Sequence, residues 1–206
     1  VCDIVFQNEA RVIVCHTGDD TLYYSSTGDA LSSTSQGSSN NDSNDESGPQ
    51  WVQIGYKDNG KIIGIYPLST TLIIFKDNGN IYSMSGTYPN WVVNLIGTKS
   101  YVVDNNGIVN LANDLVYLSS LGLQTLSTSV DFGNFSQNNL GEKCNPEIKK
   151  SISNPWIEHL GSTDQLVVSP DSSNVVWVYH YNIKAFSKWK FPDDNVVNNI
   201  IDTMSN

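Results

Sequence analysis

The residues with the most versatile chemistry in this chain are its three histidines, His16, His159 and His180. Nucleophilic catalysis requires a serine or cysteine beside such a base, and a third group that orients the base. His16 begins a turn, His159 lies in an expected loop after Trp156, and His180 alternates with aromatic residues along an expected strand. No serine has the GxSxG context of a nucleophile elbow. The sequence therefore predicts no nucleophilic active site, and it assigns no catalytic residue.

The three cysteines, Cys2, Cys15 and Cys144, are far apart and odd in number. Zinc sites and disulfide frameworks need closely spaced or paired cysteines, and no CxxC spacing is present. The oxygen-rich run Asp42 to Glu46 lacks the glycine and the terminal glutamate of a calcium loop. We expect Cys15 to be a small buried residue of an apolar strand. The sequence predicts no metal site, no cofactor and assembly in a reducing compartment.

Paired carboxylates would serve glycoside hydrolysis, which needs two such groups a few ångström apart in unlike environments. The chain has 21 acidic residues, but their spacing selects no pair. The Asp-box repeat SxDxGxTW of sialidases is absent, and Arg11 is the only arginine. A sialidase, which clamps its substrate with three arginines, is thereby excluded. Other glycosidases remain open.

The net charge of −10 bears on possible partners. Binding to a nucleic-acid backbone requires a basic patch. The lysines are scattered, apart from Lys149–Lys150 and the trio Lys184, Lys188 and Lys190. An acidic surface would instead line a conduit through which nucleic acid slides without sticking. Exposed rows of aromatic side chains would stack on sugars or bases. Strand alternation instead predicts that many of the aromatic side chains pack between twisted sheets.

The elements that must position these residues are four repeats of one local pattern. Each is a short apolar strand, a polar turn of Gly, Asn and Asp residues, and a second strand rich in aromatic or β-branched residues, which is typical of a hairpin. Once a polar insert, residues 32–50, is set aside, the repeat is roughly 40 to 50 residues long, as in β-propeller blades. The hairpins are Arg11–Cys15 with Thr21–Ser25, Thr71–Phe75 with Ile81–Ser85, Asp114–Ser119 with Leu123–Ser127, and Gln165–Ser169 with Val175–Tyr181.

We therefore expect an all-β, β-propeller-like fold of about four antiparallel blades, partial or incomplete, in one domain over residues 1–206. Residues 32–50 should form a flexible polar insert, because they contain no large apolar side chain. Residues 130–155 should form a long loop with a short helix within Glu147–Ile152. Asp193–Asp202 fits either a strand or a short helix. No apolar run is long enough for a membrane span, and the chain begins without Met, which favours a piece of a longer polypeptide.

Several repeats resemble a known family. Arg11-Val-Ile-Val-Cys15 followed by Leu22-Tyr-Tyr-Ser-Ser-Thr-Gly-Asp-Ala30 is similar to the R-V-x-x-x-G-x-x-x-L-Y-Y-S-x-x-G-D-P blade of bacteriophage tail structural proteins. The segment from Leu68 to Gly86 resembles their L-x-x-x-L-x-V-F-K-x-x-x-I-Y-x-L-x-G pattern, and that from Val176 to Trp189 resembles V-x-V-Y-D-Y-x-x-x-x-W-S-x-W. In the last segment Phe186 replaces a tryptophan and His180 an aspartate.

The resemblance points to the tail nozzle proteins of short-tailed phages, also called tail tubular protein B. It implies a propeller body in a six-fold ring of identical subunits, contacts with portal, adaptor and other tail proteins, DNA as passing cargo, and a place in the virion tail after assembly in the host cytoplasm. It implies a structural role without enzymatic activity. No functional residues are carried over, because the shared motifs are architectural. A carbohydrate- or receptor-binding propeller is the alternative, and a glycoside hydrolase is the third possibility.

Overall fold

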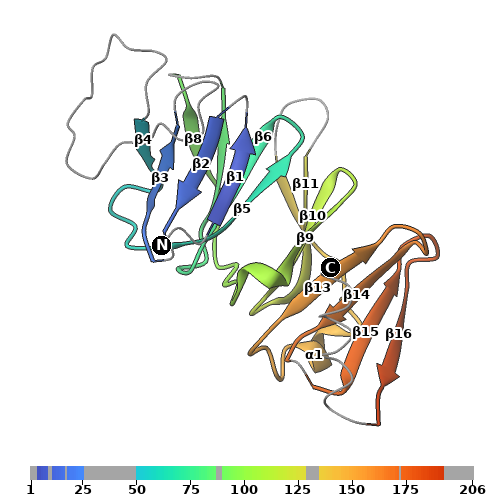
Figure 1. Cartoon of the computed structure of the whole chain (residues 1–206). Coiled ribbons are helices and arrows are strands. Elements are labelled where there is room, and N and C mark those ends of the chain that lie inside the picture. Colours follow the sequence, from blue (N-terminus) through green and yellow to red (C-terminus); the bar gives the residue numbers. More distant parts are fainter. Residues whose placement is uncertain are drawn as a thin grey trace. The chain divides into compact units, whose positions relative to one another are not determined.

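The computed structural model describes residues 4–8, 11–16, 18–25, 50–86, 90–128, 135–171 and 173–192. Within these ranges the chain forms sixteen strands, one short α-helix and one 3-10 helix (Figure 1). All strand pairs are antiparallel, and the strands make four sheets of four strands each. The predicted all-β class with four antiparallel blades is confirmed.

The chain divides into two compact units, Val1–Lys99 and Ser100–Asn206, and each contains two of the sheets. The sheets of the first unit have the orders β1-β2-β3-β4 and β5-β6-β7-β8, so strands that follow one another in the chain are also neighbours in the sheet. The strands are β1 (Ile4–Asn8), β2 (Arg11–Cys15), β3 (Thr21–Tyr24), β4 (Gln50–Gln53), β5 (Ile62–Leu68), β6 (Thr71–Lys76), β7 (Ile81–Ser85) and β8 (Val92–Gly97).

The second unit repeats this meander twice, with the orders β9-β10-β11-β12 and β13-β14-β15-β16. A 3-10 turn at Asn105–Gly107 precedes its first strand, and helix α1 (Asn145–Ile148) lies between its two sheets in sequence. The strands are β9 (Ile108–Leu111), β10 (Asp114–Ser119), β11 (Gly122–Thr128), β12 (Phe135–Asn139), β13 (Trp156–Leu160), β14 (Gln165–Ser169), β15 (Val175–His180) and β16 (Ala185–Lys190).

The four predicted hairpins are the central strand pairs of the four sheets, namely β2–β3, β6–β7, β10–β11 and β14–β15. The turn chemistry of the clearest copy is also as expected. Between β6 and β7, Gly79 adopts a φ of 81°, which glycine tolerates without steric cost. The Asn80 N–H contacts the side-chain oxygen of Asn78 at 3.0 Å, and the Lys76 N–H donates to the carbonyl of Asn80 at 3.0 Å. Local turn residues therefore set the register of this hairpin.

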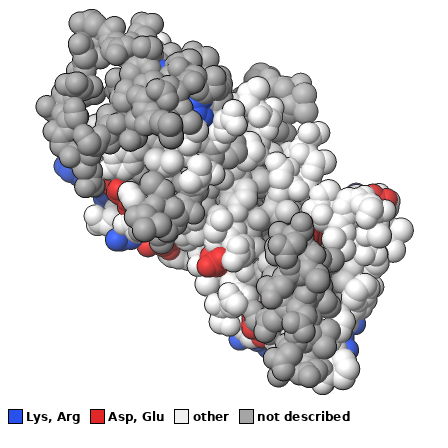
Figure 2. Space-filling model, viewed as in Figure 1, with Lys and Arg blue, Asp and Glu red and all other residues white. Residues whose placement is uncertain are grey.

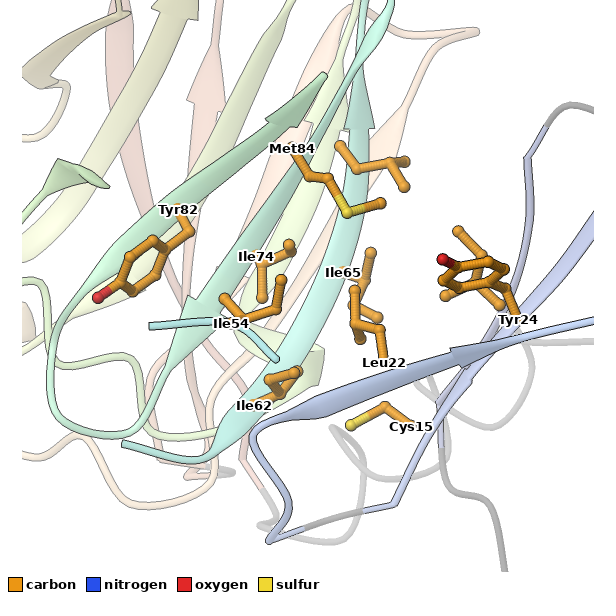
Figure 3. Packing of buried hydrophobic residues seen from close by; sticks show 11 residues of the cluster. Cys15, Leu22, Tyr24, Ile54, Ile62, Ile65, Ile74, Tyr82 and Met84 are labelled. Atoms are coloured by element: carbon orange, nitrogen blue, oxygen red, sulfur yellow. The ribbon is translucent and has the colours of Figure 1, made fainter. Parts of the chain in front are cut away.

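Each unit has its own apolar core between its two sheets. In the first unit the core contains Cys15 and Leu22 from the first sheet, which point toward Ile62 and Ile65 of the second sheet (Figure 3). In the second unit Leu118 and Leu123 of the third sheet pack in one cluster with residues of the fourth sheet and with Ile148 of α1. Burying each such side chain contributes roughly 1.5 to 3 kcal/mol. Core packing therefore makes each pair of sheets a compact unit.

Three sequence expectations need correction. Residues 130–155 are not one long loop, because β12 and α1 lie within them. The helix comprises Asn145–Ile148, with Pro146 near its start, and ends before the expected Ile152. His159 lies in β13 and not in a loop. The strand β12 reads FSQNN, and such a polar outer strand has no apolar pattern that predicts it. Of the expected insert at 32–50, residues 32–49 lie outside the described residues and Gln50 begins β4; the segment 193–202 also lies outside the described residues.

Among the described residues, no helix has both the length and the apolar character that crossing a bilayer requires.

Candidate functional site

Asp58, in the loop between β4 and β5, is the centre of a hydrogen-bond network. Its Oδ1 accepts from Lys76 Nζ at 2.6 Å and from the Gly60 N–H at 3.0 Å. Its Oδ2 accepts from the Tyr82 hydroxyl at 2.8 Å and from Asn80 Nδ2 at 3.1 Å. The network thus joins a loop to the last residue of β6, to the turn that follows, and to β7.

Lys76 makes this network an ion pair in a largely dry environment, because its side chain is 0% exposed and that of Asp58 is 14% exposed. Lys76 Nζ also donates to the carbonyl of Ile54 at 2.6 Å. Burial alone would raise the pKa of Asp58, but hydrogen bonds from Lys76 and its neighbours outweigh it and hold the pKa far below the ordinary value. Burial and the hydrogen bond to Asp58 raise the pKa of Tyr82 to about 12.

These pKa shifts decide what the network can do. A carboxylate with such a low pKa is a poor general base, and all its oxygens already accept hydrogen bonds. The Asp58–Lys76 network is therefore a structural clamp on the second sheet. Spacing along the sequence did not reveal it, since Asp58 and Lys76 are 18 positions apart and meet only when the loop folds over the hairpin.

His180 lies in a chain of polar contacts on the fourth sheet that resembles a nucleophile, base and orienting group. His180 Nε2 is 3.1 Å from the hydroxyl of Ser187, and Nδ1 is 3.4 Å from Nε2 of Gln165. The amide oxygen of Gln165 accepts from the hydroxyl of Thr163 at 3.3 Å, so its NH₂ group faces the imidazole.

The group beside Nδ1 of His180 is the amide of Gln165, so no carboxylate orients the imidazole as it does in a Ser-His-Asp triad. The arrangement is therefore not an activated serine nucleophile. The expectation that His180 alternates with aromatic residues along a strand is confirmed, because it is the last residue of β15 and lies on the face opposite Trp177 and Tyr179. Cross-strand pairing of His180 with Gln165 is the signal that could have identified this contact once the hairpin register was known.

His159 belongs to a second polar cluster, at the end of the fourth sheet where β13 turns into β14. His159 Nε2 lies 3.2 Å from the hydroxyl of Tyr181, which donates to Oδ1 of Asp164 at 2.9 Å. Asp164 has a φ of 56°, a left-handed conformation that is unfavourable for a residue other than glycine. Desolvation and the hydrogen bond to Asp164 raise the pKa of Tyr181. The cluster therefore stabilises a strained turn, and it lies on the opposite face of the sheet from His180.

The cysteines and possible metal ligands offer no further site within the described ranges. Cys15 is fully buried, which confirms the expected packing role, and Cys144 is half-buried with a pKa that burial raises. Cys2 lies outside the described residues. No group of three or more His, Cys, Asp or Glu residues that could hold a metal ion occurs in the part of the chain that the structure describes.

The sole arginine is part of the first unit's packing. Arg11 is 5% exposed, donates to the carbonyl of Ser25 at 2.6 Å and lies over the ring of Tyr24 at 5.7 Å. On the visible face in Figure 2 the lysine and arginine side chains of the described residues are scattered and form no continuous patch. Lys188 is paired with Glu147 at 2.7 Å. The described surface in this view thus shows no array of cations for binding phosphate groups.

Most of the described aromatic side chains pack as the strand alternation predicts, but some do not. Tyr117, Trp177 and Tyr179 are buried, whereas Trp51 of β4 and Trp189 of β16 are 52% and 45% exposed. Trp51 is the last residue of a row of paired residues across the first sheet, whose other members are Val5, Val14 and Tyr23. The exposed aromatic side chains Trp51, Tyr56, Tyr101 and Trp189 therefore depart from the expected packing.

The chain was compared with known proteins. No family model matches it, and no curated protein matches it. Its structure is similar to that of virginiamycin B lyase from Staphylococcus aureus, with a TM-score of 0.56 and 11% identity over 91% of this chain and 55% of the lyase. It is also similar to a streptogramin B lyase, with a TM-score of 0.55 and 13% identity over 92% of this chain and 54% of the lyase.

The chain therefore spans about half the length of these two structures. At such low identity the likeness shows the fold alone, and it confirms the β-propeller class. It also corrects the expectation of a protein without enzymatic activity. That expectation followed from the resemblance to tail nozzle proteins and from absent sequence motifs, whereas both of these similar structures are lyases. A propeller site is assembled from residues that are distant in sequence, so the absence of a short motif does not exclude catalysis.

Proposed function

We propose that this chain is a propeller module of a bacteriophage tail, of the tail nozzle type, and that it acts through contacts between subunits. In this role copies of the protein assemble into a ring, six-fold in the intact protein, and contact the portal, adaptor and other tail proteins. DNA passes through the ring as cargo. The protein is assembled in the host cytoplasm and resides in the virion.

The observation that carries the proposal is the position of the motif segments, which lie on the blades of the fold. The segments that resemble phage tail blades lie on the hairpins β2–β3, β6–β7 and β15–β16, so the likeness concerns the repeating unit of the fold. The net charge of −10 and the buried position of Arg11 fit a channel through which DNA slides without sticking to the wall.

The proposal is tested in phage particles purified from a culture of the source organism. Mass spectrometry should find peptides of this chain in a fixed ratio to the portal protein, and that ratio should persist through a second density gradient. A chain absent from the particles, or removed by the second gradient, would refute the proposal.

A second candidate is an enzymatic activity like that of the lyases that share the fold. The shared fold favours it, and His159 and His180 are the residues to test, because each has hydrogen-bond contacts with neighbouring side chains. Incubation with virginiamycin B, followed by mass spectrometry, tests this candidate directly. Turnover that is lost in His159→Ala or His180→Ala would support it, and an unchanged antibiotic would refute it for this substrate.

A further inference from the structure

The third and fourth sheets, which form the second unit, are joined along the chain by residues 140–155, and this connection contains helix α1. The strands β9 and β13 of the two sheets lie next to each other, whereas α1 packs against β11. Ile148 of α1 is 1% exposed and belongs to one apolar cluster with Leu123 of β11 and Trp177 of β15. The helix therefore connects the two sheets at a second place, apart from the contact of β9 with β13.

Asn145 attaches this connection to the third sheet through a buried contact. Asn145 is 1% exposed, its Oδ1 accepts from the Leu123 N–H at 2.9 Å, and its Nδ2 donates to the Leu123 carbonyl at 3.5 Å. The N–H of Leu140 donates to the same carbonyl at 3.1 Å. Separating a buried amide from its partners is costly, because its polar groups are then left without hydrogen bonds. The connection is therefore firmly attached to β11.

The side-chain hydrogen bonds between this connection and the fourth sheet are exposed. Glu147 of α1 pairs with Lys188 of β16 at 2.7 Å, and their side chains are 54% and 47% exposed. Lys188 Nζ also lies 5.1 Å from the ring centroid of Trp177. Further along the chain, the Ser151 hydroxyl donates to the carboxylate of Asp171 at the surface. Exposed ion pairs contribute little to stability and are weakened by salt. The attachment to the fourth sheet is therefore the weaker one.

The connection between the two sheets of the first unit is held differently. Asp58, in the loop between β4 and β5, pairs with Lys76, whose side chain is fully buried. Salt screens a buried ion pair much less than an exposed one. The first unit is therefore an internal reference for the effect of salt on the second unit.

We propose that residues 140–153 form a strap that detaches from the fourth sheet while Asn145 keeps it attached to β11, and that salt promotes the detachment. The Glu147–Lys188 ion pair holds the strap closed. Detachment removes Ile148 from the shared apolar cluster, so the open form is a minor population of the folded chain. In the open form β9 and β13 keep their contact, and the angle between the two sheets is free to change. The strap makes the second unit the adaptable one whatever partners the chain has, so its test is independent of the proposed tail role.

Hydrogen exchange followed by mass spectrometry tests the proposal with the full chain, in about 0.05 M and about 0.5 M NaCl. The amides of Ile148 and Lys149, which donate within the strap, should exchange about two- to fivefold faster at the higher salt concentration, as expected for the loss of one exposed ion pair. Peptides of β11 that contain Leu123 should keep their exchange rates. Peptides of β6 and β7 in the first unit should keep theirs as well.

Two single variants test the role of the ion pair. Lys188→Met should produce the same acceleration at the lower salt concentration and abolish the dependence on salt. Glu147→Gln should do likewise, and the double variant should exceed neither single variant. Lys190→Met is the matched control, because Lys190 is an exposed lysine two residues further along the same strand and on the same face. It should leave the exchange rates and their dependence on salt unchanged.

Strap amides that respond neither to salt nor to Lys188→Met would overturn the proposal. Exchange at Leu123 that rises together with that of the strap would also overturn it, because the strap would then not stay attached at Asn145. An equal response to Lys190→Met would reveal a general effect of charge and would refute the role of the Glu147–Lys188 pair. Detection of the chain in virions would leave the proposed tail role intact after any of these results.

Discussion

Replacement of Lys76 by methionine should destabilise the first unit strongly. Methionine keeps the apolar stem but removes the ammonium group, which leaves the carboxylate of Asp58 in a largely buried position without its counter-ion. Removing one partner of a buried ion pair costs about 3 to 5 kcal/mol. Asp58 is 14% exposed and keeps three neutral donors, so we expect a loss near the lower limit, about 3 kcal/mol.

Urea unfolding followed by tryptophan fluorescence measures this loss, because Trp51 and Trp91 belong to the same unit as Lys76. A change of about 3 kcal/mol lowers the urea midpoint by roughly 1 to 3 M. The effect should depend on pH. The folded-state pKa of Asp58 is depressed, so its contribution to stability is present above its unfolded pKa near about 4 and is lost as the pH falls below it. The difference between Lys76→Met and the wild type should therefore shrink below about pH 4.

Lys190→Met is the control, since Lys190 is an exposed lysine of an outer strand. Its effect should stay within about 0.5 kcal/mol. A loss below about 1 kcal/mol for Lys76→Met at neutral pH, or a loss that does not shrink in acid, would refute the reasoning that Lys76 neutralises a buried carboxylate.

Three further predictions concern turns, a buried amide and a tyrosine. Ala112→Gly should raise the free energy of unfolding by up to about 1 kcal/mol, because Ala112 has a φ of 55° in the β9–β10 turn and glycine adopts this conformation without steric cost. Ala185→Gly, within β16, is the control and should lower the free energy of unfolding by about 0.5 to 1 kcal/mol in the same denaturation assay. Asn145→Ala should lower it by about 1 to 3 kcal/mol, because this amide is 1% exposed and bonds to the backbone of β11; an unchanged thermal midpoint would contradict this. Ultraviolet titration should find Tyr82 ionising at about 12, and Asp58→Asn should lower that pKa. Because the folded pKa of Tyr82 is raised, its contribution to stability is present below pH 10.0 and is lost as the pH rises toward about 12.

The central strands were predictable from the sequence because two local signals agree there. Apolar runs such as Asp114–Ser119 and Gln165–Ser169 match β10 and β14 residue for residue. Glycine and asparagine in the turns then determine which strand pairs with the next. The outer strands were harder, because β12 is polar and β13, which contains His159, begins directly after Pro155. An outer strand pairs on one side only, so its sequence is less constrained.

The polar networks were not predictable, since each depends on where a loop folds. Asp58 meets Lys76, and Asp164 meets Tyr181, only after a turn brings residues 17 or 18 positions apart within hydrogen-bond distance. For the same reason the absence of catalytic motifs was misleading as an argument against an enzyme.

The sequence by itself determined the repeating hairpin, the strand pairing within it and the acidic, nearly arginine-free character of the chain, because these depend on neighbouring residues and on composition. Only the tertiary structure decided which aromatic side chains are buried and which of the two faces of each sheet is covered. Strand alternation places Trp51 on the outer face of its sheet. It does not show whether another part of the protein covers that face. Burial is a property of the partner surface, and that surface is distant in sequence.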